Sequence, residues 1–152
     1  MDSFLFDEGI IIPKIGKTAK LMTYHLGDSM INAGIDLSKE QFVVLKYLYH
    51  KNGMIQNDLA FITDRSKTAL TRLLSTLEKK NYIYRESGES DKRNKYVYLS
   101  EAGRTAYEEA LPVIQRLISE LQSGIKKEEL IITQRVLDII LENICKNYSN
   151  AR

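Results

Sequence analysis

Residues 58–85 read DLAFITDRSKTALTRLLSTLEKKNYIYR, and this stretch decides the fold. A short apolar helix is predicted over about residues 56–62, followed by a polar break over 63–66 and a second helix with Ser66 as its N-cap. The inner face of the second helix is apolar and carries Leu70, Leu73, Leu74 and Leu77. The outer face is polar and basic and carries Lys67, Thr68, Thr71, Arg72 and Ser75. This arrangement predicts a helix-turn-helix.

After Asn81 the pattern changes from helical to strand-forming. Aromatic and β-branched residues fill 82–86 (YIYRE) and 95–100 (KYVYLS), and the polar stretch 87–94 (SGESDKRN) separates them. The pair predicts a β-hairpin with a long basic loop. A helix-turn-helix followed by such a hairpin is a winged helix. Its second helix fits the major groove of DNA, and its wing can reach phosphates or the adjacent minor groove.

Further helices are predicted on both sides of this core. Upstream, apolar residues recur every three or four positions at Ile15, Ala19, Met22, Leu26 and Met30. Residues 38–41 form a capping box that opens a helix ending near residues 52–53, and Ser100 caps a long helix. The last helix runs from about Lys127 to Asn147. We therefore predict a mainly α fold and one domain, 1–152, with a winged helix-turn-helix core over 38–100, a two-stranded β-hairpin wing and flanking helices over 12–34 and 101–148.

The last helix has more apolar surface than the winged helix needs to cover. One of its faces carries Leu130, Leu137, Ile140, Leu141 and Ile144, with Val136 and Ile139 beside it. We expect the flanking helices to be dimerisation helices that intertwine with a second copy, although an intrachain core is the alternative. A twofold dimer presents two recognition helices about one DNA turn apart, which predicts a pseudo-palindromic operator.

The charge is concentrated in the middle of the chain. The 152 residues carry a net charge of only +2, but residues 64–95 hold nine Lys or Arg against five Asp or Glu. The rest of the chain holds 13 basic and 15 acidic residues. A basic segment between mildly acidic ends indicates contact with a polyanion. The alternative is a solvated charged surface.

Several classes of protein are disfavoured by the sequence. The longest apolar stretches are too short for a membrane span, and the acidic start lacks the pattern of a signal peptide, so we expect a cytoplasmic protein. Cys145 is the single cysteine, and His25 and His50 form no metal-ligand motif. There is also no glycine-rich phosphate loop and no nucleophile with a partner base. We therefore expect no enzyme, no metal and no cofactor.

Residues 58–85, followed by SDKRNKYVYLSEAG (90–103), resemble the MarR family of winged-helix transcription regulators. The most specific elements are Asp91-Lys92-Arg93, similar to a D-x-R wing tip, and residues 99–103 (LSEAG), similar to an L-T-x-x-G entry to the next helix. Two residues depart from the family pattern. Ser100 replaces a Thr, and both cap helices. Asn81 replaces a Gly, and Asn tolerates the left-handed backbone.

The resemblance implies a function and a set of contacts. The wing Arg93 is expected in or near the minor groove, held by Asp91, and double-stranded DNA is the expected partner. The predicted DNA-contact residues are Ser66, Lys67, Thr68, Thr71, Arg72, Asp91, Lys92, Arg93 and Lys95. The family often binds small phenolic or other aromatic effectors, here expected near Tyr24 and His25, although an ordinary half-buried histidine is the alternative. The expected function is a sequence-specific repressor tuned by such an effector; the alternative is a winged-helix protein-interaction subunit without DNA binding.

Overall fold

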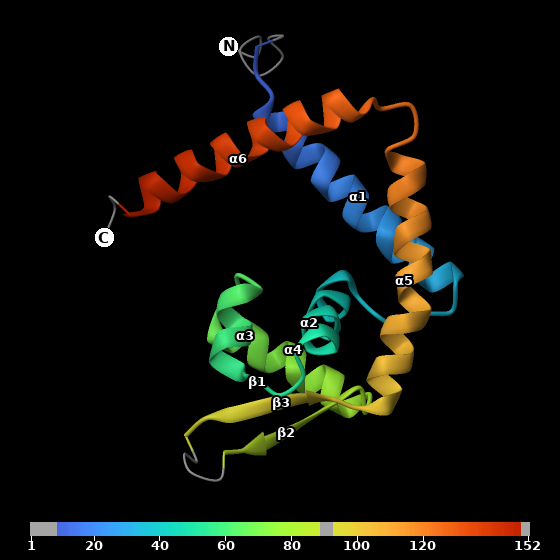
Figure 1. Cartoon of the computed structure of the whole chain (residues 1–152), viewed down its shortest axis with the longest axis vertical. Coiled ribbons are helices and arrows are strands. Elements are labelled where there is room, and N and C mark those ends of the chain that lie inside the picture. Colours follow the sequence, from blue (N-terminus) through green and yellow to red (C-terminus); the bar gives the residue numbers. More distant parts are fainter. Residues whose placement is uncertain (1–8, 89–92, 150–152) are drawn as a thin grey trace. The chain divides into compact units, whose positions relative to one another are not determined.

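The computed structural model describes residues 9–88 and 93–149 of the chain. The elements, in order, are α1 (Ile12–Asn32), α2 (Lys39–His50), β1 (Met54–Ile55), α3 (Gln56–Ile62), α4 (Lys67–Lys79), β2 (Ile83–Ser87), β3 (Lys95–Leu99), α5 (Glu101–Leu121) and α6 (Lys127–Ser149). They confirm the predicted mainly helical chain with a helix-turn-helix and a hairpin (Figure 1). The chain divides into two compact units, Met1–Leu117 and Ile118–Arg152.

The predicted helix boundaries in the first unit rest on specific caps. The capping box of α2 is present, because Gln41 N donates to Ser38 Oγ at 3.2 Å and Ser38 N donates to Gln41 Oε1 at 3.1 Å. After α4, Asn81 adopts a left-handed backbone with φ 58°. This conformation ends the helix, and asparagine is one of the few side chains that tolerate it. The prediction that Asn81 preserves the turn in place of the usual glycine is thus confirmed.

The core of the first unit lies between α2, α3, α4, the sheet and the start of α5. It includes three of the four predicted inner residues of α4, since Leu70, Leu74 and Leu77 are fully buried, whereas Leu73 is partly buried against this core. The other buried members are Met30, Leu37, Phe42, Val44, Leu45, Leu48, Met54, Leu59, Ala60, Ile83, Val97, Leu99, Ala106, Tyr107 and Ala110. Burial of these side chains removes apolar surface from water and holds α4 with its opposite, polar face outward.

The hairpin belongs to a sheet of three antiparallel strands in the order β1-β3-β2, one strand more than predicted. Met54 of β1 pairs with Val97 of β3, and Tyr84 of β2 pairs with Tyr98 of β3. The added strand has only two residues, too few to show the alternation that reveals a strand in a sequence. Gly53 precedes it with φ 73°, where a Cβ would lie 2.8 Å from the Tyr98 ring.

A tight junction joins the hairpin to α5. Ser100 Oγ donates to the carbonyl of Asn81 at 2.6 Å and accepts from Gly103 N at 3.0 Å. A Cβ on Gly103 would lie 2.0 Å from the carbonyl oxygen of Tyr82. Only glycine allows the first turn of α5 to approach the chain before β2 this closely. The motif LSEAG therefore has a structural purpose, which is to anchor the base of the wing.

Both flanking regions leave apolar side chains exposed. In the first unit, Met30 of α1 is only 1% exposed, whereas Met22 of the same predicted stripe is 46% exposed. In the second unit, no side chain of α6 is buried among its described residues. The exposed large apolar residues of that unit are Ile118, Leu121, Ile125, Ile131, Ile132, Leu137, Ile139, Leu141 and Ile144. No helix within the described ranges is both long and apolar enough to cross a membrane.

Candidate nucleic-acid interface

The outer face of α4 carries the predicted recognition residues in exposed positions. Lys67, Thr68, Thr71 and Arg72 are all exposed, while Leu70, Leu74 and Leu77 of the opposite face are buried. Ser66 is confirmed as the N-cap, because its Oγ accepts from Ala69 N at 3.1 Å. The cap satisfies a backbone donor in the first turn and fixes where the helix begins. The result is a capped helix with two cations and two hydroxyl-bearing side chains on its solvent face.

Thr71 also connects the two helices of the helix-turn-helix. Its Oγ1 accepts a hydrogen bond from Gln56 Nε2 at 3.0 Å and donates to the Lys67 carbonyl at 2.8 Å. Gln56 is the first residue of α3, so this contact holds the start of α3 against α4. Because the Thr71 proton is already used within the helix, Thr71 can meet a base only as an acceptor or through its methyl group.

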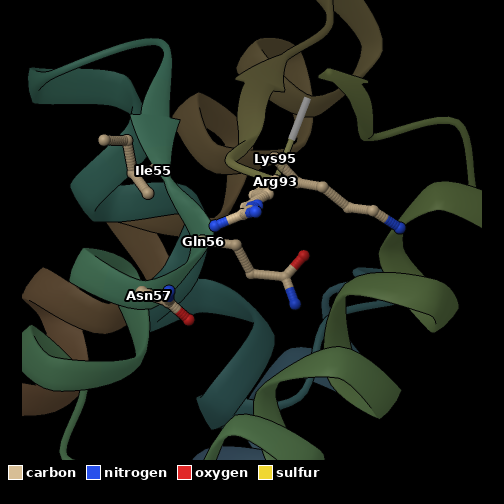
Figure 2. Close-up of a pocket in the computed structure, with 5 residues that line it drawn as sticks. All are labelled: Ile55, Gln56, Asn57, Arg93 and Lys95. Atoms are coloured by element: carbon tan, nitrogen blue, oxygen red, sulfur yellow. The ribbon is translucent and has the colours of Figure 1, made fainter. Parts of the chain in front are cut away.

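The described part of the wing brings two of its predicted basic residues to a pocket. Arg93 and Lys95 are exposed, and together with Ile55, Gln56 and Asn57 they line a pocket of about 120 Å³. Figure 2 shows the Gln56 side chain reaching into this pocket, with Arg93 and Lys95 beside it. The other two predicted wing residues, Asp91 and Lys92, lie outside the described residues.

Some of the basic residues of the middle segment bind carboxylates of the same chain. Lys80 Nζ lies 2.7 Å from Asp36 Oδ1 and also donates to the Gln41 amide oxygen at 3.2 Å. Arg65 lies 4.0 Å from Glu40. These contacts hold the ends of α3 and α4 against α2 and the segment before it. Part of the positive charge counted in the sequence is therefore used in ion pairs that stabilise the fold.

A further ion pair fixes the wing relative to the recognition helix. Arg85 of β2 donates through Nε to Glu78 Oε2 of α4 at 3.2 Å, and its Nη2 donates to the same oxygen. The hydrogen bond from Arg85 lowers the pKa of the Glu78 carboxyl, and the positive charge of Lys95 adds to this. Glu78 is thus held in its charged form, and its pairing stiffens the angle between α4 and the hairpin.

Tyr24 and His25 occupy neighbouring exposed positions on α1. Tyr24 is 58% exposed, and the ammonium of Lys20 lies 5.8 Å from its ring centroid. His25 is also exposed in the single chain. Within the described residues, no three His, Cys, Asp or Glu side chains are grouped to hold a metal ion.

The comparison with known proteins assigns this arrangement to a family. A sequence model of the MarR family matches residues 37–95, from the end of the α1–α2 linker to the start of β3. YdcH of Bacillus subtilis (strain 168), an uncharacterized HTH-type transcriptional regulator, is 31% identical over 101 residues, which are 64% of this chain and 69% of YdcH. The chain belongs to the MarR family. Members of the MarR family are DNA-binding transcription regulators and not enzymes, so both expectations from the sequence are confirmed.

Two further MarR-type proteins illustrate the likeness. The transcriptional regulator HosA of Escherichia coli is 28% identical over 94 residues, 62% of this chain and 70% of HosA. MepR of Staphylococcus aureus, solved in complex with DNA, is 26% identical and superimposes with a TM-score of 0.78, covering 94% of this chain and 98% of MepR. The winged-helix fold predicted for this MarR-family chain is thereby confirmed.

Two residues of this MarR-family surface are absent from the prediction made on the sequence. Gln56 and Asn57 follow β1 directly, and the pocket places them beside the wing. Sequence spacing could not reveal this, because Gln56 and Lys95 are 39 positions apart and meet only through the pairing of β1 with β3. The one sequence feature that could have pointed to these two residues is the presence of adjacent amide side chains, Gln56 and Asn57, at the very start of the helix-turn-helix.

Proposed function

We propose that this MarR-family chain is a homodimeric repressor that binds a pseudo-palindromic operator, with α4 in the major groove and the wing at the adjacent minor groove. One observation carries the proposal: the exposed, basic outer face of α4 stands beside an exposed basic wing. Lys67 and Arg72 supply charge on the helix, and Arg93 supplies it on the wing. Side chains on a helix of this kind reach base edges, whose donor and acceptor pattern is distinct for each base pair.

The two elements have different tasks in this proposal. Arg93 contacts phosphate or the minor groove, where A·T and T·A are nearly equivalent, so it contributes affinity without much selectivity. Arg72 and Lys67 lie where they can reach base edges, and a good bidentate pair distinguishes bases by roughly 1–3 kcal/mol. The Glu78–Arg85 pair supports both tasks because it fixes the spacing of the two elements.

The exposed apolar residues of α1 and of residues 118–149 support the homodimer. An apolar surface of this kind is unusual on a monomer and typical of an interface. A second copy is the proposed cover, and a twofold dimer would present two copies of α4 to one face of the duplex. A dimer that occupies promoter DNA excludes other proteins from it, and this exclusion is the basis of the proposed repressor role.

The effector is proposed to bind near Tyr24 and His25. Both side chains are exposed in the single chain and offer an aromatic ring, a phenol and an imidazole to a small aromatic ligand. Because α1 also carries part of the exposed apolar surface, a ligand there would act on the dimer geometry and so on the distance between the two recognition helices.

The first test is DNA binding itself. A fluorescently labelled duplex from the promoter upstream of the chain's own gene is titrated with protein, and anisotropy is read at 100 and 200 mM KCl against a scrambled duplex. The proposal expects tighter binding to the promoter at both salt concentrations, and weaker binding to both duplexes at the higher one. Failure to bind either duplex would favour the alternative function, a protein-interaction subunit without DNA binding.

A further inference from the structure

The pocket beside the wing lies where a strand of the DNA backbone has to pass. In B-DNA, the major groove and the adjacent minor groove are separated by one sugar-phosphate strand. If α4 occupies the major groove and the wing the minor groove, that strand crosses between them. The pocket joins these two elements, because Arg93 and Lys95 belong to the wing side and Gln56 is hydrogen-bonded to Thr71 of α4.

The chemistry of the pocket suits a phosphodiester group. Its five lining residues provide a guanidinium, an ammonium, two amides and one aliphatic side chain, and none of the five is acidic. The Glu78 carboxylate, whose pKa the positive charge of Lys95 helps to lower, is paired with Arg85. Arginine and lysine are the usual ligands of backbone phosphates. A phosphate oxygen entering this pocket would therefore meet the cationic donors of Arg93 and Lys95, and none of the five lining residues offers it a carboxylate.

We propose that this pocket binds one phosphate of the DNA backbone between the two grooves, with Lys95 and Arg93 as its cationic ligands and Gln56 as the residue that positions them. The proposal rests on the DNA-binding function proposed above and assigns a distinct contact within it.

Gln56 has the geometry for this positioning. Its Nε2 is bound to Thr71 Oγ1 at 3.0 Å, which fixes the amide plane, and its Oε1 is buried with no hydrogen-bond partner among the described residues. Figure 2 shows the Gln56 amide in the same pocket as the side chains of Lys95 and Arg93. An ammonium has three donors, so Lys95 can bond the amide oxygen and a phosphate oxygen together. A bound phosphate would hold the Lys95 ammonium in the pocket, and this ammonium would then supply the donor that the buried oxygen lacks.

The experiment measures salt dependence on generic DNA, because a backbone contact is independent of sequence. Anisotropy titrations of a 24-base-pair duplex of random sequence are run at several KCl concentrations for the wild type, Lys95→Gln, Gln56→Glu and Lys17→Gln. The last is the matched control, since Lys17 is an exposed lysine of α1 and its replacement changes the net charge equally. Thermal unfolding by circular dichroism confirms that each variant is folded.

We expect Lys95→Gln to reduce the slope of log K against log salt by about 0.9 for each protomer on the duplex. Gln56→Glu should reduce the slope similarly and weaken binding at low salt at least tenfold, because a carboxylate would occupy the place of the phosphate. Lys17→Gln should keep the wild-type slope. A folded Lys95→Gln whose slope equals that of wild type or of Lys17→Gln would overturn the proposal.

Two other outcomes separate this proposal from its alternatives. If Gln56 only docks α3 against α4, Gln56→Glu and Thr71→Val would weaken binding together while the slope stays unchanged, which would also overturn the phosphate site. A wild-type protein that binds neither the random duplex nor promoter DNA would contradict the proposed function itself. Binding by wild type with an unaltered slope in Lys95→Gln would contradict only the phosphate site.

Discussion

Replacing Gly103 with alanine should destabilise the base of the wing. The added Cβ would lie 2.0 Å from the Tyr82 carbonyl oxygen and 2.9 Å from Leu99 Cδ1. The first contact involves backbone, so α5 and the chain before β2 must separate. That movement would stretch the bond from Ser100 N to the Tyr82 carbonyl, now 3.1 Å, and the bond from Ser100 Oγ to the Asn81 carbonyl, now 2.6 Å.

The size of the effect follows from these contacts. Overpacking costs roughly 1–3 kcal/mol, and each weakened hydrogen bond costs about 1 kcal/mol. Alanine in a helix returns about 1 kcal/mol relative to glycine. We therefore expect Gly103→Ala to lose about 2–4 kcal/mol of unfolding free energy, equivalent to roughly 1–2 M in the urea midpoint for a typical m-value.

The assay is urea unfolding followed by circular dichroism at one fixed protomer concentration, because the stability of a dimer depends on concentration. Gly16→Ala is the matched control: it makes the same change within α1, where, apart from the adjacent residues and the backbone of the helix itself, no atom of the protomer lies within 4 Å of the added Cβ. The control should unfold at an equal or higher urea concentration than wild type. A Gly103→Ala midpoint at or above that of wild type would refute the argument about the junction.

Three further predictions concern the recognition helix, its link to the wing and the dimer. Ser66→Ala should lose about 1 kcal/mol of unfolding free energy, whereas Ser66→Asp should keep the cap but bind DNA more weakly; equal DNA binding by Ser66→Asp and wild type would place Ser66 away from the phosphates. Since Arg85 lowers the pKa of Glu78, the pair stabilises the fold above the ordinary Glu value of 4.5 and loses this contribution as the pH falls below it. Urea midpoints of wild type and Glu78→Gln should thus differ at pH 7 and converge toward pH 3, and a gap that stays constant would contradict this. Leu141 is 59% exposed, so Leu141→Glu should leave the protomer folded and give a monomer in light scattering at micromolar concentration, while a dimer of unchanged mass would move the interface elsewhere.

Local chemistry made much of the fold predictable from the sequence. The capping box at Ser38, the N-cap at Ser66 and the left-handed Asn81 each depend on a few adjacent residues, and the structure confirms all three. The buried face of α4 was predictable for the same reason, because helical periodicity is a property of one segment.

The features that the sequence did not reveal depend on contacts between distant segments. β1 has two residues and is defined by its pairing with β3. Lys80 and Arg85 contribute to the basic count, yet each lies against a carboxylate of the same chain, and a charge pattern does not identify such partners. Gln56 meets the wing through the same β1–β3 pairing, so its place in the pocket could be found only in three dimensions.

The most direct test of the account compares specific with non-specific binding for two variants, one on each DNA-contact element. Arg72→Ala on α4 and Arg93→Ala on the wing are titrated, with wild type, against promoter and scrambled duplexes at two salt concentrations. Arg93→Ala should weaken binding to both duplexes by similar factors and lower the salt slope by about one. If Arg72 reads a base, Arg72→Ala should weaken promoter binding by roughly 5- to 150-fold, corresponding to 1–3 kcal/mol, with a much smaller loss on scrambled DNA. Wild-type affinity of both variants for every duplex would contradict the account, because neither the outer face of α4 nor the wing would then contact DNA.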